Sequence, residues 1–455
     1  MRFARAVFIG AGVYGAVVRV GGVLLLMLLC VAPPAHAQSP LTLADAIARA
    51  RAHNPEAGST AAAEQEAAQR VAEMRAGYWP KVDLAETWQR GNAAGFVFSS
   101  RLAERRLAAP DFALDVLNHP AAADAFRTTI SIEQPLFNRT IAANVREASV
   151  ARQMAGTSRQ LVDQLLAANV TDAFGRALIA AARVRSTVAV VETARADREL
   201  AGNRRDAGRV TEADVLQLDV YLARAVAAQM EAVADERVAR ARLNQLMGDP
   251  LDAVFSLDPE PATVSIDTTE PAALEAAALR DRPEVLLARQ QEQRAAAAVG
   301  AAHAAFLPTI AAQGGWDLDG GQWNARSTSW MVGAVARINL FNGFADKARL
   351  AAARYELTRR AFDKDGAESL ARLDVLAAIA RLEAARAQEA VGRTAADQAR
   401  ASHRIVRDRY AGGLADITTL LRAADAIDQA DQQQTAARVG VLVAAANLQR
   451  AIGKL

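Results

Sequence analysis

The residues that most often carry catalysis or bind metals are few and scattered in this chain of 455 residues. Beyond the first 40 residues the histidines are His53, His119, His303 and His403, with no H-x-x-x-H spacing among them. The single cysteine is Cys30, so neither C-x-x-C ligation nor soft-metal binding has a ligand set. Aspartate and glutamate are plentiful, but on long helices they usually form a solvated face. We therefore expect no catalytic residue, no metal site and no cofactor.

Residues 1–37 have the pattern of a secretory signal. Arg2, Arg5 and Arg19 precede a short apolar run, and Ala35-His36-Ala37 matches an A-x-A cleavage site. The pattern predicts cleavage between Ala37 and Gln38, so that the chain is exported.

Cys30 allows a second interpretation, in which the cysteine is acylated as in a lipoprotein. A small residue is expected before such a cysteine, and Leu29 stands there instead. No later apolar run approaches the roughly 20 residues of a spanning helix. An exported chain of this kind is expected to be periplasmic, extracellular or a membrane β-barrel.

The charge balance argues against a nucleic-acid partner. The chain has 53 Lys and Arg against 51 Asp and Glu, and three of the basic residues lie in the leader, which leaves 50 against 51. Nucleic-acid binding would require a clustered basic excess. Hydrophobic residues make up 52% of the chain but aromatic ones only 5%, so the apolar content is mainly small and aliphatic. Such side chains suit closely packed helices.

The chain repeats itself. Asn54-Pro55-Glu56 recurs as Arg282-Pro283-Glu284, and Tyr78-Trp79-Pro80 recurs as Phe306-Leu307-Pro308, each 228 residues later. An internal period of this kind is best sought before any other feature, because it determines the whole architecture. The chain is predicted to consist of two homologous halves.

The repeat continues downstream at a shorter spacing. Pro135-Leu136-Phe137-Asn138 recurs as Asn339-Leu340-Phe341-Asn342, and Ala207-Gly208-Arg209-Val210 recurs as Ala411-Gly412-Gly413-Leu414, each 204 residues later. The halves end on Leu246-Met247-Gly248 and Ala451-Ile452-Gly453, 205 residues apart. The drop from 228 to 204 predicts about 24 extra residues in the first half, between positions 80 and 135.

Each half is predicted to contain a pair of strands after a first helix that stops at a proline. The helical stretches are 55–77 and 283–305. In the strands that follow, apolar side chains such as Val82 and Leu84 alternate with polar ones such as Asp83, a pattern typical of a half-buried strand. A long loop, about 92–125, is expected in the first pair and a short one, about 317–327, in the second.

Very long helices follow the strands. No proline occurs between Pro135 and Pro250 or after Pro308, and the stretch from 139 to 206 would reach roughly 100 Å as one helix. Gly208 and the Gly412-Gly413 pair interrupt these stretches, because glycine supplies the left-handed conformation that ends helices. A second helix should then return in each half.

The tryptophans fall in the strand zones. All five, Trp79, Trp88, Trp316, Trp323 and Trp330, lie there, which favours the aromatic girdles of a membrane barrel over a packed core. Four strands cannot close a barrel, and open strand edges are not tolerated in lipid. Several copies must therefore combine.

Several motifs resemble landmarks of the TolC-like outer-membrane efflux protein family. They are Leu41-Thr42-Leu43-Ala44-Asp45-Ala46-Ile47 with Thr42 and Asp45 as a capping box and leading to Asn54-Pro55-Glu56, Gly77-Tyr78-Trp79-Pro80, Glu133-Gln134-Pro135-Leu136-Phe137-Asn138, Arg282-Pro283-Glu284, Leu340-Phe341-Asn342-Gly343 and Arg409-Tyr410-Ala411-Gly412-Gly413. They occur in order over nearly all of 41–453.

The resemblance implies a mainly α fold with a small β part. Duplicated long antiparallel helical hairpins would form an α-barrel across the periplasm. Four transmembrane strands per chain would contribute to a twelve-stranded barrel in a homotrimer in outer-membrane lipid. Such proteins act without chemistry as exits that open when a periplasmic adaptor (membrane fusion protein) and an inner-membrane RND or ABC transporter dock.

The domain boundaries follow from the repeats. They are a signal peptide at 1–37, a first repeat at 38–248, a linker at 249–271 and a second repeat at 272–455. The strand hairpins are expected at about 79–138 and 307–341, and the helical hairpins at about 139–248 and 343–453.

The helix-reversal turns are predicted to form the periplasmic aperture and the adaptor contact. The candidate residues are Gly208, Arg209, Val210, Thr211, Asp214, Tyr410, Gly412, Gly413, Leu414, Thr419 and Arg422. Some relatives narrow this entrance with carboxylates where Thr419 and Arg422 stand here. An entrance ringed by arginines would repel cations, so weaker cation selectivity is expected.

Two other functions stay open at this point. The duct could serve protein secretion through an ABC-type (type I) system rather than small-molecule efflux. The long hairpins could also belong to a soluble periplasmic coiled-coil scaffold, although an adaptor should carry lipoyl-like modules and a single hairpin.

Overall fold

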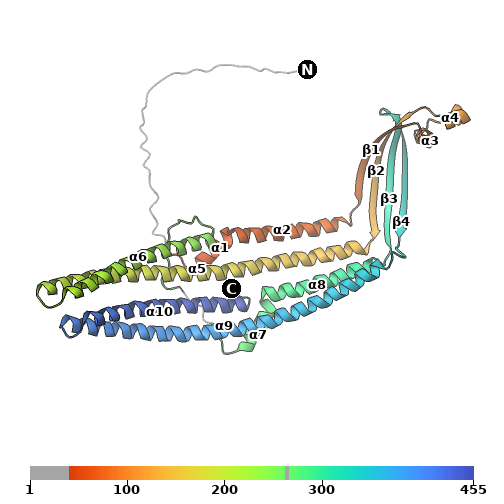
Figure 1. Cartoon of the computed structure of the whole chain (residues 1–455). Helices are drawn as coiled ribbons and strands as arrows, with labels where there is room; N and C mark the ends of the chain where they lie inside the picture. The colour runs from red at the N-terminus through yellow and green to blue at the C-terminus, as the bar shows by residue number, and fades with distance from the viewer. Residues whose placement is uncertain (1–39, 262–265) are drawn as a thin grey trace, which may run out of the picture. The chain divides into compact units, whose positions relative to one another are not determined.

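The computed structural model describes residues 40–261 and 266–455, which form one compact unit, with one four-stranded antiparallel sheet and long helices (Figure 1). The predicted leader, including Cys30 and the Ala37–Gln38 junction, lies outside these residues. The elements are α1 Leu43–His53, α2 Pro55–Ala76, β1 Lys81–Gly91, α3 Ala94–Ala103, η1 Ala109–Phe112, α4 Leu114–Asn118, β2 Ala123–Phe137, α5 Arg139–Asp206, α6 Glu212–Met247, α7 Pro271–Asp281, α8 Pro283–Ala304, β3 Thr309–Gln322, β4 Ala325–Arg337, α9 Ala345–Ala411 and α10 Ile417–Ala451.

The two halves begin alike. α2 and α8 both start with proline, which has no N–H to lose at the first helical position and a φ already suited to a helix. Asn54 caps α2 by accepting the Glu56 N–H at 2.8 Å. At the equivalent place before α8, Arg282 makes no such cap and instead pairs with Asp374 of α9 at 2.7 Å.

α1 begins with Thr42, whose hydroxyl oxygen accepts the Asp45 N–H at 3.1 Å. The Asp45 carboxylate does not return a bond to the Thr42 backbone but accepts its hydroxyl at 2.7 Å. The reciprocal capping box predicted from the sequence is therefore replaced by a cap in one direction, with the carboxylate held by the capping side chain itself.

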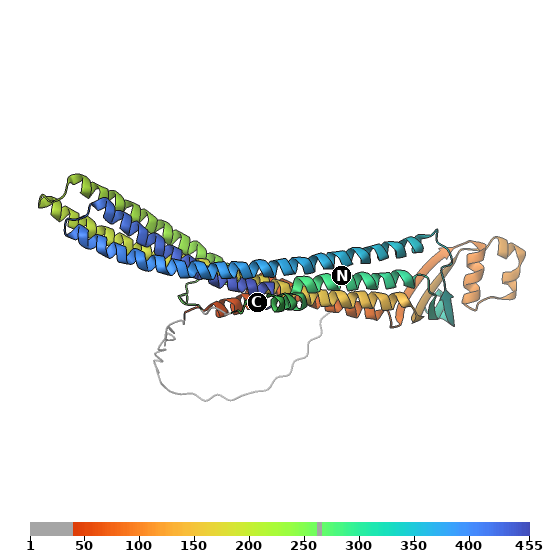
Figure 2. The same ribbon diagram turned by 90° about the horizontal axis from the view of Figure 1, so that it is seen from below.

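The helical hairpins are the longest elements. α5 and α9 have 68 and 67 residues, so each spans about 100 Å, and α6 and α10 return along them (Figure 2). α5 also packs on α10, and Gly175 of α5 makes that approach possible, because a Cβ there would lie 2.5 Å from Val439. α5 holds a segment long and apolar enough to cross a membrane, but 56% of it is buried, as in a core helix.

Each half of the chain ends with a glycine in the left-handed conformation. This glycine packs against the short helix that begins the same half. Gly248 (φ +77°) follows α6, and a Cβ there would lie 2.5 Å from the His53 carbonyl oxygen at the end of α1. Gly453 (φ +76°) follows α10, and a Cβ there would lie 2.7 Å from the Asp281 carbonyl oxygen at the end of α7. A side chain at either position would combine a strained backbone with a clash against main chain.

The sheet has the strand order β1-β2-β3-β4, all antiparallel. The expected short loop at 317–327 is wrong, since β3 runs to Gln322 and β4 begins at Ala325. The strand continues because its carboxylates are satisfied by the neighbouring strand: Asp319 accepts from Arg127 and Asp317 accepts from Thr129, each at 2.6 Å.

The long segment between β1 and β2 is not a plain loop. It contains α3, η1 and α4 around a small core of its own, in which Val97 is buried and Phe98 meets Phe112 edge to face at 5.7 Å. Its Glu104 carbonyl accepts a hydrogen bond from the Ser327 hydroxyl at 2.6 Å. The segment is thereby attached to the start of β4.

Candidate functional site

Two regions of the described structure have features beyond packing: the helix reversals at one end and the sheet at the other. At each reversal a helix ends on a left-handed glycine, Gly208 (φ +68°) after α5 and Gly413 (φ +76°) after α9. The next N–H then bonds back five residues, from Arg209 to the Arg204 carbonyl and from Leu414 to the Arg409 carbonyl, both at 2.8 Å. This is a Schellman-type ending, which satisfies the last carbonyls of each helix.

The structure changes the equivalence of the two turns by one residue. Sequence comparison pairs Gly208 with Gly412, but Gly412 has an ordinary right-handed backbone and Gly413 adopts the left-handed one. The spacing at the tip is therefore 205, the same as at the ends of the two halves. Gly412 and Gly413 both lack a Cβ, so either could adopt the left-handed conformation. Only the φ angle observed in the structure shows which of them does so.

The return helices also start alike. Thr211 caps α6 through a reciprocal box, in which the Asp214 carboxylate accepts the Thr211 N–H at 2.8 Å. Asp416 caps α10 by accepting the Thr419 N–H at 2.7 Å. Asp214 thus holds the turn together, and the pKa of Asp416 is lowered by its hydrogen bonds from Thr419.

A small apolar core joins the two reversals into one tip. Its buried members are Ala201, Val215, Leu218, Tyr410, Ile417 and Leu420, drawn from α5, α6, α9 and α10. The predicted residues Arg209, Gly412, Leu414, Thr419 and Arg422 lie on the exposed surface around this core, and Val210 is half-buried. The expectation that they meet an adaptor or shape an aperture remains a prediction.

Arg204 links the hairpins across the tip and was missed in the sequence. Its Nη1 donates to the Tyr410 carbonyl at 3.0 Å, its Nη2 donates to the Ala411 carbonyl, and its guanidinium lies 5.2 Å from the Tyr410 ring. A cation at the end of α9 also complements the helix dipole. In the sequence, Arg204 is only a basic residue near the end of a predicted helix. Such residues are common, so nothing indicated its contact with the other hairpin.

Above the tip, titratable groups from all four helices face one another. Burial raises the pKa of Tyr221 to about 12 and raises the pKa of Asp197 and Asp425. Burial lowers the pKa of His403, assisted by the nearby charge of Arg407. Each shift disfavours the charged form, as expected where water is partly excluded between the two hairpins.

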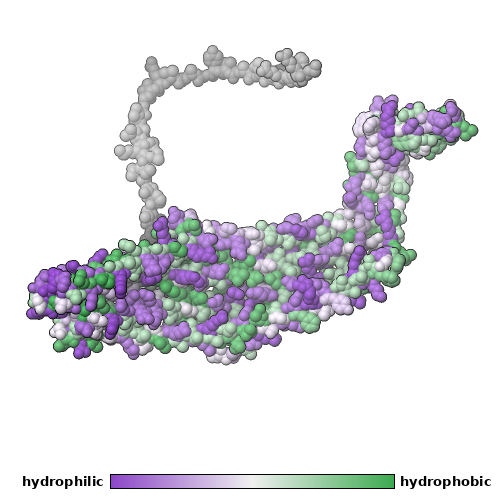
Figure 3. Space-filling model, viewed as in Figure 1, coloured by the Kyte–Doolittle hydropathy of each residue, from purple (hydrophilic) through white to green (hydrophobic). Residues whose placement is uncertain are grey.

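The sheet has one apolar and one polar face. Residues directly opposite on neighbouring strands share a face, and Leu84, Ile130, Trp316 and Trp330 stand in one such row. The adjacent row is Ala85, Thr129, Asp317 and Ser329, on the other face. Figure 3 shows apolar residues gathered where the sheet meets the helices, and a mixture of hydrophilic and apolar residues on the sheet itself.

The tryptophans occupy three levels along the sheet. Trp79 precedes β1 at the helix end, and Trp316 and Trp330 face each other in mid-strand. Trp88, bonded to Asp124 at 3.2 Å, and Trp323, at the β3–β4 turn, mark the far end. All five are more than half exposed, so they do not form a core within one chain. Membership in two girdles remains a prediction.

The far end also carries a charged cluster that sequence reasoning missed. Arg326 pairs with Glu86 at 3.0 Å and stacks 4.0 Å from the Trp323 ring. Glu86 and Arg326 are 240 positions apart, so no local pattern could have joined them.

Comparison with known proteins extends these observations. The sequence model of the family described as outer membrane efflux protein matches residues 274–454. Protein CyaE of Bordetella pertussis is 28% identical over 406 residues, which are 86% of this chain and 79% of CyaE.

Two further relatives match over shorter stretches. The outer membrane efflux protein BepC of Brucella suis is 27% identical over 281 residues, 59% of this chain and 60% of BepC. The alkaline protease secretion protein AprF of Pseudomonas aeruginosa is 25% identical over 249 residues, 53% of this chain and 52% of AprF. The alignments therefore span only about half to three fifths of these two relatives.

The fold is also that of solved outer-membrane channels. The open state of the MtrE outer membrane channel of Neisseria gonorrhoeae superposes with a TM-score of 0.74 at 17% identity, over 90% of this chain and 89% of MtrE. The long helical hairpins and the small sheet are thus a known architecture, as the sequence motifs predicted. The second half of the chain thus matches the outer membrane efflux protein family, and the similarity to the relatives and the shared fold extend that likeness over most of the chain.

Proposed function

We propose that three copies of this outer-membrane protein form one duct, a barrel in the membrane continued by a helical tunnel across the periplasm, through which a tripartite pump expels small molecules. One observation carries the proposal: a four-stranded sheet, apolar on one face and polar on the other, whose first and last strands each pair on one side only within the described chain.

The sheet supports assembly on physical grounds. Every residue of β1 from Lys81 to Arg90 is exposed, and most of β4 is exposed as well, whereas β2 and β3 are largely half-buried. Unpaired N–H and C=O groups cost several kcal/mol each in hydrocarbon, so these edges must pair before the sheet can enter lipid. Three copies would supply twelve strands, with the polar faces turned to a water-filled lumen.

The long helices support the same assembly. α6 exposes large apolar side chains, namely Leu216, Val220, Met230, Val233 and Val238. α9 exposes another set, namely Tyr355, Phe362, Leu370, Leu373, Leu376, Val391 and Ile405. In α9, Phe362 and Leu376 lie 14 positions apart and Leu370 and Val391 lie 21 apart, which is the heptad spacing of a coiled-coil seam. In α6, Leu216 and Met230 lie 14 positions apart. The α6 of one chain and the α9 of the next would bury each other's stripes.

The structure of the tip and the similarity to the relatives support the proposed partners, a periplasmic adaptor and an inner-membrane transporter. The compact tip is suited to docking by the helical hairpins of a periplasmic adaptor, behind which an RND or ABC transporter would supply the energy. The similarity to BepC, an outer membrane efflux protein, favours efflux, and the similarity to AprF, an alkaline protease secretion protein, favours protein secretion through a type I system as the second candidate. A soluble scaffold would leave the exposed apolar face of the sheet unexplained.

The cargo class is tested by deleting the gene. We expect the deletion strain to become several-fold more sensitive to amphipathic drugs and dyes, because the exit of the pump is lost, and a plasmid copy should restore resistance. The measurement is the minimal inhibitory concentration together with the protein content of the culture medium. Unchanged drug sensitivity with loss of one secreted protein would instead establish the secretion system.

The trimer is tested by disulfide cross-linking of the strand edges. Cysteine at Ala85 of β1 should cross-link to cysteine at one of Ser327, Ser329 or Met331 of β4 in another chain, giving trimers on non-reducing gels. The single natural cysteine lies in the leader, so the background is clean. Cysteine at Ser131 of β2, which is paired on both sides within its own chain, is the matched control and should give monomers only.

A further inference from the structure

A cavity of about 420 Å³ lies where the helices meet the sheet. Its walls come from the start of α5, the end of α8 and the start of α9, three helices that pack side by side. The charged side chains that line it are Arg139 and Arg146 of α5 and Arg354 of α9, with His303 of α8 beside them. The remaining lining is small or apolar, made mostly by alanines of α5 and α8 together with Gly300, Leu307 and Leu350.

This cavity has no counter-charge within the described residues. No aspartate or glutamate lines it, and none of the three guanidinium groups forms an ion pair or a side-chain hydrogen bond in residues 40–261 and 266–455. All three arginines are exposed, whereas other arginines of this chain, among them Arg159 and Arg289, pair with carboxylates of neighbouring helices.

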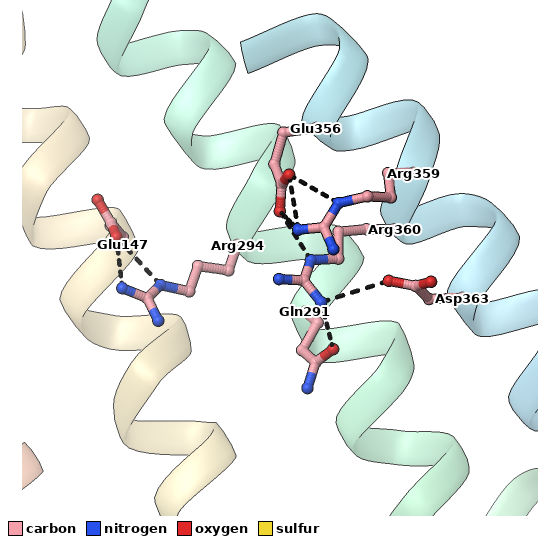
Figure 4. Close-up of polar contacts among 7 residues, drawn as sticks. All are labelled: Glu147, Gln291, Arg294, Glu356, Arg359, Arg360 and Asp363. Atoms are coloured by element: carbon pink, nitrogen blue, oxygen red, sulfur yellow. Dashed lines mark hydrogen bonds and ion pairs between the residues drawn. The ribbon is translucent and has the colours of Figure 1, made fainter. Parts of the chain in front are cut away.

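Figure 4 shows the acidic side chains near the cavity and the arginines with which they pair. Glu147, next to Arg146 in the chain, accepts two bonds from Arg294, at 3.0 and 2.8 Å. Glu356, two positions after Arg354, is held by Arg359 and Arg360. Glu147 and Glu356 are therefore already paired with other arginines. The positive charges of the three arginines that line the cavity are not balanced by these two acids.

Such a cavity suits a tetrahedral oxyanion. Guanidinium groups present paired N–H donors that match the spacing of phosphate oxygens, and they keep their charge at any physiological pH. Arg139 is also the first residue of α5, so the positive end of a long helix dipole adds to the field. Alanines and a glycine leave room for the ligand between the arginines.

We propose that this cavity binds a phosphate group, carried either by a phospholipid headgroup or by a free phosphate. Leu307 of the lining leads through Pro308 directly into β3, and the ring of Phe306 lies 6.1 Å from that of His303. The cavity therefore adjoins the end of the sheet and its exposed aromatics, the level at which lipid headgroups meet a membrane barrel. The site does not depend on the cargo or on the pump that the duct serves.

The test measures phosphate binding by the purified full-length mature protein in two arms. One arm is equilibrium dialysis with radiolabelled inorganic phosphate in detergent. The other is lipid mass spectrometry after reconstitution in nanodiscs of mixed phosphatidylglycerol and a neutral, phosphate-free glycolipid, scored by the phosphatidylglycerol retained through detergent washing. Arg146→Gln should weaken binding about tenfold, since it removes one charge-assisted pair of hydrogen bonds, and Arg139→Gln with Arg146→Gln and Arg354→Gln should abolish it.

Two variants control for charge and folding. Arg146→Lys keeps the charge but loses the paired donors, so its affinity should fall between wild type and Arg146→Gln. Arg381→Gln removes an exposed arginine of α9 far from the cavity and should leave binding unchanged. Binding in the lipid arm alone identifies a headgroup, and binding in the dialysis arm alone identifies a free phosphate. Equal binding in both arms by wild type and by Arg146→Gln would overturn the proposal, whatever the triple variant does.

Discussion

Arginine in place of Val332 should abolish assembly in the outer membrane, whereas arginine in place of Ser329 on the same strand should be tolerated. Val332 lies on the apolar face, two positions from Trp330, and is 75% exposed in one chain. In a barrel that exposed side chain would face lipid. An arginine at the midplane of a barrel costs about 2–4 kcal/mol, so three copies would cost roughly 6–12 kcal/mol.

Ser329 makes a matched control because it belongs to the other face. It stands directly opposite Asp317, whose carboxylate would attract a new guanidinium in a water-filled lumen. The measurement is the amount of heat-modifiable trimer in the outer-membrane fraction on unboiled gels. If Ser329→Arg removed the trimer and Val332→Arg did not, the polar face would have to point outward and the proposed lumen would be wrong.

Replacing Arg204 with alanine should loosen the tip and raise the conductance of the channel several-fold. The change removes two hydrogen bonds to the carbonyls that end α9 and the contact with the Tyr410 ring. A charge-assisted hydrogen bond contributes about 1.5–3 kcal/mol and a cation–π contact about 0.5–1 kcal/mol at an exposed site. Because Arg204 is half-exposed, we expect a net loss of roughly 2–3 kcal/mol at the link between the hairpins.

The readout is single-channel conductance in planar bilayers. Arg204→Lys should lie between wild type and Arg204→Ala, because lysine keeps the charge but cannot serve two carbonyls with a planar fork. Arg195→Ala, on α5, removes an exposed arginine without an ion pair among the described residues and should change little. Equal conductance of wild type and Arg204→Ala would show that this link does not restrain the tip.

The features that could be predicted from the sequence are those that depend on near neighbours. Pro55 and Pro283 indicated the helix starts, because proline suits the first position of a helix whatever surrounds it. Alternation around Leu84 indicated a two-faced strand, and the long proline-free stretches indicated the long helices. The mainly helical fold with a small sheet is confirmed by the structure and by the solved channels that share it.

The predictions from the sequence were wrong where a distant residue or a backbone angle determines the local structure. The strand through Asp317 and Asp319 looked like a loop because two carboxylates seldom sit in a strand, yet partners 188 and 192 positions away satisfy them. The pairing of Gly208 with Gly412 was one residue off, since the choice between adjacent glycines depends on which of them has positive φ.

The sequence by itself therefore determined the repeat and the order of the helices and strands, because periodicity, prolines and glycines act locally. Only the tertiary structure decided which side chains meet. Arg204 and Tyr410 are 206 positions apart and are brought together by two helix reversals. Arg139, Arg146 and Arg354 line one cavity because α5, α8 and α9 run side by side, and their charge is uncompensated because neighbouring arginines hold the available acids.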